Sequence, residues 1–191
     1  MPRIEKDDQR ILEVGCGIGQ LFIASGVGEN VCAVGIDVDH GALVYGRTRY
    51  GNLNYVEADG GALPFRDESF DLMVSRVTLP YTNLPEAVKE TARILRRGGR
   101  VWFSLHPLSM ALQALGNHVR SLRARGAIHG VYVIANGLLL HLVGKVAPFP
   151  PTGVYESFQT ERGMRRLLRA AGFRDITVTR GRHFIVTARR E

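Results

Sequence analysis

The stretch from Arg10 to Leu21, which reads RILEVGCGIGQL, restricts the possible fold more than any other part of the sequence. A short apolar run, Ile11–Val14, predicts a buried strand, and glycines follow it at every second position from Gly15 to Gly19. Glycine has no Cβ, so a glycine turn between a strand and a helix lets the backbone approach a ligand closely and directs free amide groups toward it. The stretch therefore predicts a nucleotide-binding turn at the edge of an α/β sheet.

The chain continues in the same style as far as Leu105. Short apolar runs alternate with longer mixed segments, which is the pattern of strands and crossover helices in a parallel sheet. A helix is expected from Asn83 to the stop at Gly98-Gly99, with Pro85 in its first turn. The other expected elements are strands at 11–14, 31–36, 53–56, 70–75, 100–105, 174–180 and 184–188, and a helix at 160–171.

The pattern changes after His106-Pro107. Residues 108–125 are expected to be helical, 128–144 to form a second apolar helix, and 147–153 to form a proline-rich loop. We interpret this region as an insertion, or cap, at about 107–153 within a single domain that spans 1–191, since domains commonly run to about 100–200 residues.

Composition restricts the cellular setting. Cys16 and Cys32 belong to no CxxC pair or metal-ligand cluster, so we expect free thiols, no metal site and a cytoplasmic location. The first ten residues, MPRIEKDDQR, lack the apolar core of a signal peptide. The apolar run 128–144 contains His129, Asn136 and His141 and is shorter than the roughly 20 apolar residues of a membrane span, so no span is expected.

The net charge of +7 comes from arginines scattered through the second half of the chain. Such a balance is compatible with a nucleic-acid partner, but arginines on solvated helix faces are the commoner explanation. A nucleic-acid partner is therefore not favoured, although it is not excluded.

Two common nucleotide ligands fit the glycine turn poorly. The dinucleotide fingerprint GxGxxG requires its third glycine where this chain has Gln20. A phosphate-binding P-loop requires a lysine followed by Ser or Thr after the last glycine, and the chain has Gln20-Leu21 there.

Three acids indicate a different ligand. Glu13, two residues before the first glycine, would repel a pyrophosphate but can accept hydrogen bonds from an ammonium group. Asp37, at the end of the second strand, is suited to a ribose diol. Asp59, after the third strand, could accept a hydrogen bond from the amino group of adenine. An amino group, a ribose and an adenine occur together in S-adenosylmethionine, which is therefore the ligand that these acids indicate.

Three segments of the chain carry a family resemblance: LEVGCGIG at 12–19, ADGGALPFRDESFDLMV at 58–74 and PEAVKETARILRRGG at 85–99. With Asp37 between the first two, the chain resembles the class I S-adenosylmethionine-dependent methyltransferases, in the type 11-like group that acts on small molecules. The resemblance implies an α/β fold, a Rossmann-like three-layer sandwich. Its sheet would be seven-stranded and mostly parallel, with an antiparallel last strand and, here, a helical insertion after the fifth strand.

The resemblance also assigns cofactor contacts. The turn from Gly15 to Gly19 would wrap the amino-acid part of S-adenosylmethionine, and Ser75 and Arg76 would lie near its methionine moiety. Val38 would pack on the adenine, and Gly60 would complete the base pocket. The alternative for Asp37 is a helix cap near His40. The cofactor-binding residues expected are Glu13, Gly15, Cys16, Gly17, Gly19, Asp37, Val38, Asp59, Gly60, Ser75 and Arg76.

Methyl transfer from a sulfonium requires alignment more than any particular catalytic group. If the acceptor is a hydroxyl or an acidic carbon, a general base helps, and Tyr81 and His106 are the main candidates because they follow carboxyl ends of strands. His129 and His141 in the insertion are further candidates.

The expected activity is methyl transfer to a small apolar or aromatic acceptor. The chain begins about nine residues before its first strand, so we expect Leu108–Pro151 to cover the acceptor; alternatively, this segment packs against a second copy of the chain in a homodimer. An RNA or protein methyltransferase, and a catalytically silent module that binds S-adenosylmethionine, remain alternatives.

Overall fold

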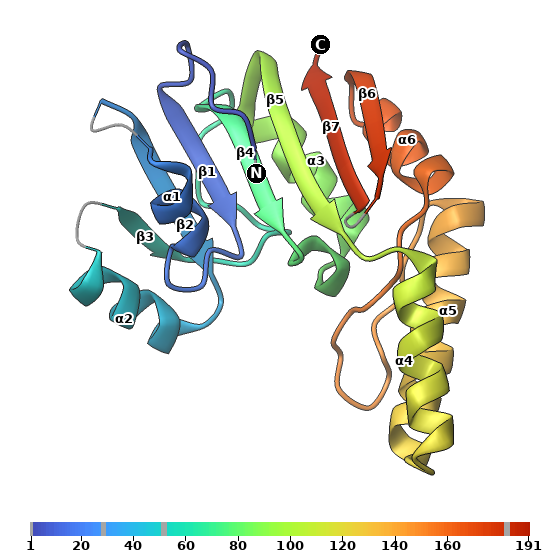
Figure 1. The fold of residues 1–191 in the computed structure, drawn as a ribbon. Helices are drawn as coiled ribbons and strands as arrows, with labels where there is room; N and C mark the ends of the chain where they lie inside the picture. The colour runs from blue at the N-terminus through green and yellow to red at the C-terminus, as the bar shows by residue number, and fades with distance from the viewer. Residues whose placement is uncertain (1, 28–29, 51–52, 182–183) are drawn as a thin grey trace.

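A seven-stranded sheet in the order β3-β2-β1-β4-β5-β7-β6 forms the centre of the computed structural model, which describes residues 2–27, 30–50, 53–181 and 184–191 (Figure 1). The first five strands in the sequence pair in parallel, and β7 runs antiparallel between β5 and β6. This confirms the mostly parallel sheet with an antiparallel last strand. The strands are β1 (Arg10–Val14), β2 (Cys32–Asp37), β3 (Asn54–Glu57), β4 (Phe70–Arg76), β5 (Leu95–Leu105), β6 (Phe173–Arg180) and β7 (Phe184–Arg190).

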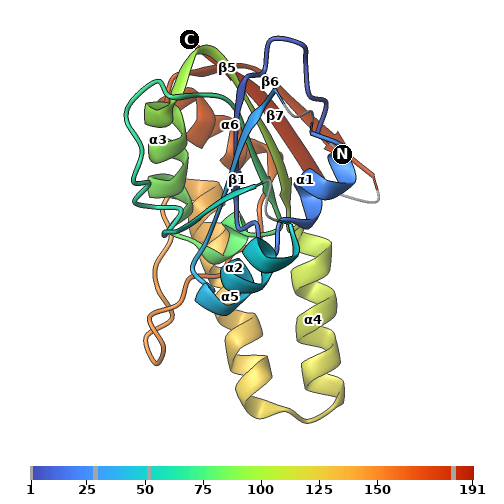
Figure 2. The ribbon, with the colours of Figure 1, turned by 90° about the vertical axis from the view of Figure 1, so that its left-hand side faces the viewer.

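Helices lie on both sides of this sheet. Figure 2 shows α1 on one side and α3 with α6 on the other, which gives three layers. The short helix η1 (Leu79–Tyr81) follows β4, and α2 (His40–Arg49) follows β2. The remaining bounds are α1 (Gln20–Ser25), α3 (Leu84–Ile94) and α6 (Glu161–Ala170).

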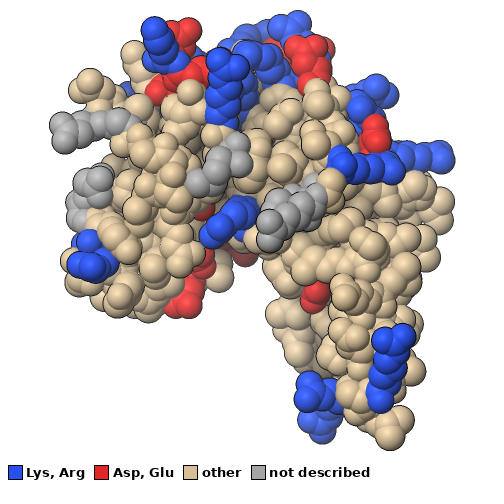
Figure 3. All heavy atoms as spheres, viewed as in Figure 1, with Lys and Arg blue, Asp and Glu red and all other residues tan. Residues whose placement is uncertain are grey.

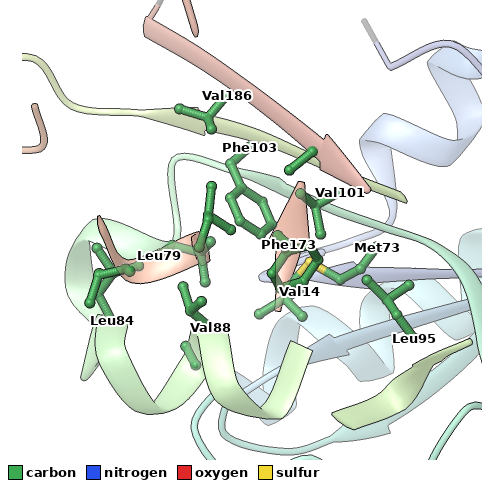
Figure 4. Packing of buried hydrophobic residues seen from close by; sticks show 14 of the residues in the cluster. Val14, Met73, Leu79, Leu84, Val88, Leu95, Val101, Phe103, Phe173 and Val186 are labelled. Atoms are coloured by element: carbon green, nitrogen blue, oxygen red, sulfur yellow. The ribbon is translucent and has the colours of Figure 1, made fainter. Parts of the chain in front are cut away.

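The main core lies between the sheet and α3 (Figure 4). Alternate residues of β5, namely Val101, Phe103 and Leu105, point into it because successive side chains of a strand face opposite sides. Leu84 and Val88 of α3 meet them, each at most 1% exposed. Burial of these apolar groups holds the carboxyl ends of β1, β4 and β5 in a fixed relation, and the candidate site is built on those ends.

The helix expected to continue to Gly98-Gly99 is shorter than predicted. α3 ends at Ile94, and Leu95 already pairs with Phe70 as the first residue of β5. Leu95 is fully buried in the core, and the pairing then shifts so that Leu72 meets Arg100. The two glycines therefore lie within an irregular start of β5, because tertiary burial of Leu95 outweighs the local stop signal.

Two long helices project from the carboxyl end of β5 (Figure 1). They are α4 (Leu108–Arg120) and α5 (Ala124–Val143), and we call them together the α4–α5 hairpin. A Cβ on Gly137 of α5 would lie 2.2 Å from Cδ1 of Phe158, so the missing side chain lets that ring pack against the helix. The chain returns to the sheet beside β5, where the N–H of Gln159 donates to the carbonyl of His106 at 2.8 Å.

Arg93 of α3 anchors the loop that follows β3. Its guanidinium donates to the carbonyls of Leu63 and Phe65 at 2.9 and 2.7 Å, and to carboxylate oxygens of Glu90 and Asp67. Glu90 in turn accepts from the N–H of Leu63 at 2.9 Å. The loop that carries Asp59 and Gly60 is thus attached to a helix of the core.

We expect Arg93→Lys to lower the free energy of unfolding by about 1–3 kcal/mol, because an ammonium group cannot reproduce the planar set of donors. Urea unfolding followed by circular dichroism measures the change. The control is Lys89→Gln, which removes an exposed pair with Glu86 and should change stability by less than about 0.5 kcal/mol. Equal effects of the two substitutions would contradict the anchoring role.

Candidate functional site

The glycine turn between β1 and α1 has a different reason for each glycine. All three have positive φ, at 75° for Gly15, 51° for Gly17 and 88° for Gly19. A Cβ on Gly15 would lie 1.9 Å from Oγ1 of Thr78, and one on Gly19 would lie 2.5 Å from the hydroxyl of Tyr55. A Cβ on Gly17 would meet no described atom within 4 Å. Gly15 and Gly19 are therefore required by packing, whereas Gly17 leaves space open toward a ligand.

Asp37, at the end of β2, fixes this turn. Its Oδ2 accepts from the N–H of Gly17 at 2.7 Å, and its Oδ1 accepts from the N–H of Asp39 at 3.0 Å. The alternative that Asp37 caps a helix near His40 is wrong, because the N-cap of α2 is Asp39, whose Oδ1 accepts from the N–H of Ala42. Each carboxylate oxygen of Asp37 retains accepting capacity for a further donor such as a diol.

Glu13 is a buried acid at the base of the turn. Glu13 is 2% exposed, and its Oε2 has no hydrogen-bond partner within the described part of the chain. Burial raises the pKa of Glu13 to about 8; the guanidinium of Arg76 opposes this shift and the carboxylate of Asp37 adds to it. A buried acceptor without a donor is unfavourable, so the position favours a ligand that brings a donor and a positive charge.

Cys16 lies beside these acids but carries no nucleophilic chemistry. Its Sγ packs where a Cβ on Gly35 would lie, at 2.7 Å. Burial raises the pKa of the Cys16 thiol to about 12, and the carboxylates of Glu13 and Asp37 raise it further. The thiol therefore stays protonated near neutral pH and acts as a small apolar group.

A cleft of about 890 Å³ opens above the turn, at the carboxyl ends of β1, β4 and β5. Its position agrees with the general location of ligand sites in open α/β sheets. Of the residues predicted from the sequence, the cleft is lined by Glu13, Gly15, Cys16, Gly17, Asp37, Arg76 and His106.

The other predicted cofactor contacts do not line this cleft. Gly19 packs against Tyr55. Ser75 is fully buried in β4, and its Oγ has no hydrogen-bond partner within the described ranges. Val38 is 68% exposed, and the Oδ1 of Asp59 accepts from a neighbouring backbone N–H at 2.6 Å. Gly60 is buried, and a Cβ there would lie 3.0 Å from a methyl group of Val14. Because Val38 and Asp59 follow the adjacent strands β2 and β3, their role at an adenine stays a prediction.

A smaller cavity of about 280 Å³ lies between the α4–α5 hairpin and η1 and shares His106 and Met110 with the cleft. The rings of Tyr81 and His106 meet edge to face here, with centroids 5.3 Å apart. Burial lowers the pKa of His106, an effect that the Glu156 carboxylate opposes, and burial raises the pKa of Tyr81. His129 also lines the cavity, with Nε2 at 2.7 Å from Oε2 of Glu156.

His141 is placed differently from the other candidate bases. Its Nδ1 lies 2.7 Å from the hydroxyl of Thr160, the N-cap of α6, and it lines neither the cleft nor the cavity. We assign it a structural role.

Sequence reasoning missed several residues of the cleft. Trp102 and Ser104 of β5 line it, and strand alternation could have placed them opposite the core residue Phe103. Ser109, Met110 and Gln113 of α4 line it as well. No local pattern predicts that α4 turns toward the cleft, because this depends on how the hairpin docks.

The residues present fit S-adenosylmethionine. The Oε2 of Glu13, unpartnered among the described residues, suits its ammonium group. Gly17 leaves room for the amino-acid part of the cofactor to approach the backbone, and Asp37 suits its ribose. A diphosphate would instead place negative charge beside the Asp37 carboxylate, and it would bring no positive charge to the buried carboxyl group of Glu13. The fold and the cleft therefore define a class I, Rossmann-like protein of the type that binds S-adenosylmethionine.

Comparison with known proteins relates part of the chain to a known family. The family model described as a methyltransferase domain matches residues 12–103, and over this stretch the chain is similar to S-adenosylmethionine-dependent methyltransferases. Among curated proteins it is similar to the ubiquinone/menaquinone biosynthesis C-methyltransferase UbiE of Serratia proteamaculans, with 36% identity over 126 residues, 58% of this chain and 50% of that protein. The chain thus spans about half the length of the curated relatives it matches.

Solved structures show the same fold at low identity. A methyltransferase from Thermotoga maritima aligns with a TM-score of 0.67 and 15% identity over 98% of this chain and 84% of its own. Magnesium protoporphyrin IX methyltransferase from Synechocystis, solved with bound S-adenosylhomocysteine, aligns with a TM-score of 0.60 and 19% identity over 95% of this chain and 74% of its own. Both comparisons support the Rossmann-like architecture.

The burial of Glu13 predicts a pH-dependent stability. The pKa of Glu13 is raised from 4.5 to about 8 in the folded chain, so between these pH values the folded chain holds a proton that the unfolded chain has lost. The free energy of unfolding of wild type therefore falls as pH rises from about 4.5 to about 8. Glu13→Gln lacks the effect, so its stability relative to wild type should rise by roughly 3 kcal/mol between pH 5 and pH 8.5.

Urea unfolding at both pH values provides the measurement. Glu86→Gln alters an exposed pair with Lys89 and serves as the control, with a change of less than about 0.5 kcal/mol at either pH. A constant difference between Glu13→Gln and wild type would show that the carboxyl group is not buried as described.

Proposed function

We propose that the chain transfers a methyl group from S-adenosylmethionine to a small aromatic or apolar acceptor, with quinone precursors as the preferred class. The observation that carries this proposal is the small cavity that meets the cleft at His106 and Met110. Such a junction can bring an acceptor to the open end of a cofactor. The C-methyltransferase relatives, whose names refer to ubiquinone and menaquinone biosynthesis, support an aromatic acceptor.

In this mechanism, S-adenosylmethionine supplies a methyl group already activated by the positive sulfonium. Glu13 binds the ammonium group, Gly17 allows close backbone approach, and Asp37 holds the ribose. A cofactor held by these residues would supply its methyl group to an acceptor in the adjoining cavity, and alignment of the two reactants would supply much of the rate.

His106 is proposed to accept a proton from an acceptor hydroxyl or acidic carbon. His106 is 8% exposed, and burial lowers its pKa. The imidazole is therefore neutral near pH 7 and can act as a base. Glu156 lies close enough to oppose that shift and would stabilise the imidazolium after proton transfer. Tyr81, whose pKa is raised by burial, stays a phenol that can donate a hydrogen bond to the acceptor.

The apolar side chains of the cavity exclude water from the reaction. Val133 of α5 and Phe158 of the returning segment are 7% and 1% exposed, and Ala111 of α4 belongs to the same apolar cluster. An aromatic ring is suited to these walls, because burying it releases water from apolar surface. We accordingly propose that residues 107–153 act as the cap of a single domain.

The alternatives have less support. An RNA or protein methyltransferase would draw on the arginines of α6, but Arg162, Arg165 and Arg169 line a depression that shares no residue with the cleft.

The free thiols of Cys16 and Cys32 agree with the cytoplasmic setting that forms part of this proposal.

The test is transfer of labelled methyl groups from S-adenosylmethionine to 1,4-dihydroxynaphthalene and related hydroquinones. We expect turnover by wild type, and a reduction in kcat of about 10²–10⁴-fold in His106→Asn. Asp37→Ala should instead weaken S-adenosylhomocysteine binding by about 10–100-fold, as measured by calorimetry.

Two controls complete this experiment. His106→Asn should bind S-adenosylhomocysteine with wild-type affinity, and His141→Asn should retain wild-type turnover because His141 lies outside both cavities. Tight binding with no turnover on any aromatic acceptor would contradict the proposal and favour a silent binding module.

A further inference from the structure

The outer face of α5 is apolar and has no partner among the residues that the structure describes. Ile128, Val131, Leu138 and Leu142 recur at the spacing that places residues on one side of a helix, and they are 62%, 58%, 47% and 62% exposed. Leu139 and Val143 widen the same surface, at 36% and 54% exposed. Isolated exposed apolar residues are ordinary, but a continuous stripe marks an interaction surface.

The turn of the α4–α5 hairpin extends this surface. Leu122 is 91% exposed and Val119 is 57% exposed, so both large apolar side chains are in water at the tip. In Figure 3 the hairpin is a largely uncharged projection with Lys or Arg atoms near its end. The apolar surface therefore runs from the tip along α5 toward the body of the domain.

α5 is the helix, among the described residues, that is long and apolar enough to cross a membrane by length and composition. Its inner face is nevertheless held by the domain. Leu140 is fully buried, Asn136 donates to the carbonyl of Glu156 at 2.9 Å, and Gly137 packs against Phe158. A helix bound on one side and bare on the other suits a position along an interface better than one across a bilayer.

The charge pattern of the hairpin favours one kind of occupant for this face. The sequence has no Asp or Glu between Thr91 and Tyr155, a stretch that includes the whole hairpin. Arg120, Arg123 and Arg125 are exposed at the tip, and Lys145 is exposed just beyond the other end of α5. A second copy of the chain on this face would bring these cations together with no acid in the hairpin to pair with them. An anionic surface pairs with all of them.

We propose that the α4–α5 hairpin docks on an anionic phospholipid bilayer, with the outer stripe of α5 in the boundary between headgroups and acyl chains and the tip arginines among lipid phosphates. His129, Gly130 and Val133 of α5 line the acceptor cavity on the inner side of the same helix. Docking would hold that cavity next to the membrane, where apolar molecules concentrate. The docking proposal is independent of which reaction the site performs.

The test is flotation of the full chain with phosphatidylcholine vesicles that contain about 40% phosphatidylglycerol, which gives a strongly negative surface. Vesicles of phosphatidylcholine alone serve for comparison. We expect co-flotation with the anionic vesicles, and less of it as salt is raised. The triple variant Arg120→Gln, Arg123→Gln, Arg125→Gln should lower the partition coefficient on the order of 100-fold. Leu138→Ser with Leu142→Ser should lower it at least about tenfold.

Matched controls separate docking from general charge and hydrophobicity. Arg49→Gln, Arg66→Gln and Arg97→Gln remove the same charge from exposed positions elsewhere, and Ile23→Ser with Val44→Ser removes exposed apolar groups from α1 and α2. Both controls should float like wild type, and circular dichroism should show every variant folded.

Three outcomes would overturn the proposal. These are no flotation of wild type, equal losses in the hairpin and control variants, or a dimer in light scattering that Leu138→Ser with Leu142→Ser dissociates while flotation is absent. In the last case the stripe would be an interface between copies of the chain. Methyl transfer to a soluble hydroquinone would remain measurable in each case, so failure of docking is distinguishable from failure of the proposed activity.

Discussion

The burial of the Glu13 carboxyl group, whose Oε2 has no hydrogen-bond partner among the described residues, is the constraint on which the rest of the site depends. Burial of an ionised carboxylate is unfavourable, so burial raises the pKa of Glu13 to about 8. The strand and the glycine turn that hold it there are fixed from the other side by the hydrogen bond between Asp37 and Gly17. Ligand selection follows, because a cationic amino group can pair with the buried carboxyl group of Glu13, whereas a diphosphate brings no positive charge to it.

The order of elements and the identity of the turn could be predicted from the sequence, because strand alternation, glycines and acids are local signals. The end of α3 could not, since Leu95 joins β5 through burial in the core and contact with Phe70. The roles of the three glycines also depend on distant residues: Thr78 and Tyr55 account for Gly15 and Gly19, and only Gly17 faces open space. Local pattern gave the same prediction for all three.

The α4–α5 hairpin links two parts of this account. Its inner side supplies Met110 to the cleft and His129 to the adjoining cavity, positions that depend on how the two helices dock and that no local pattern reveals. Its outer side is a stripe of exposed apolar residues in an acid-free stretch of the chain. A segment that resembles an interruption of the α/β pattern thus contributes to the site on one face and provides an interaction surface on the other.

The most direct test of the central claim is the number of protons released when S-adenosylhomocysteine binds at pH 7, measured by titration calorimetry in buffers of different ionisation enthalpy. If a ligand ammonium group pairs with Glu13, whose pKa in the free protein is about 8, wild type should release close to one proton. Glu13→Gln should release almost none. Equal proton release by the two proteins would contradict the account, since the cationic headgroup would then be recognised without the buried carboxyl group.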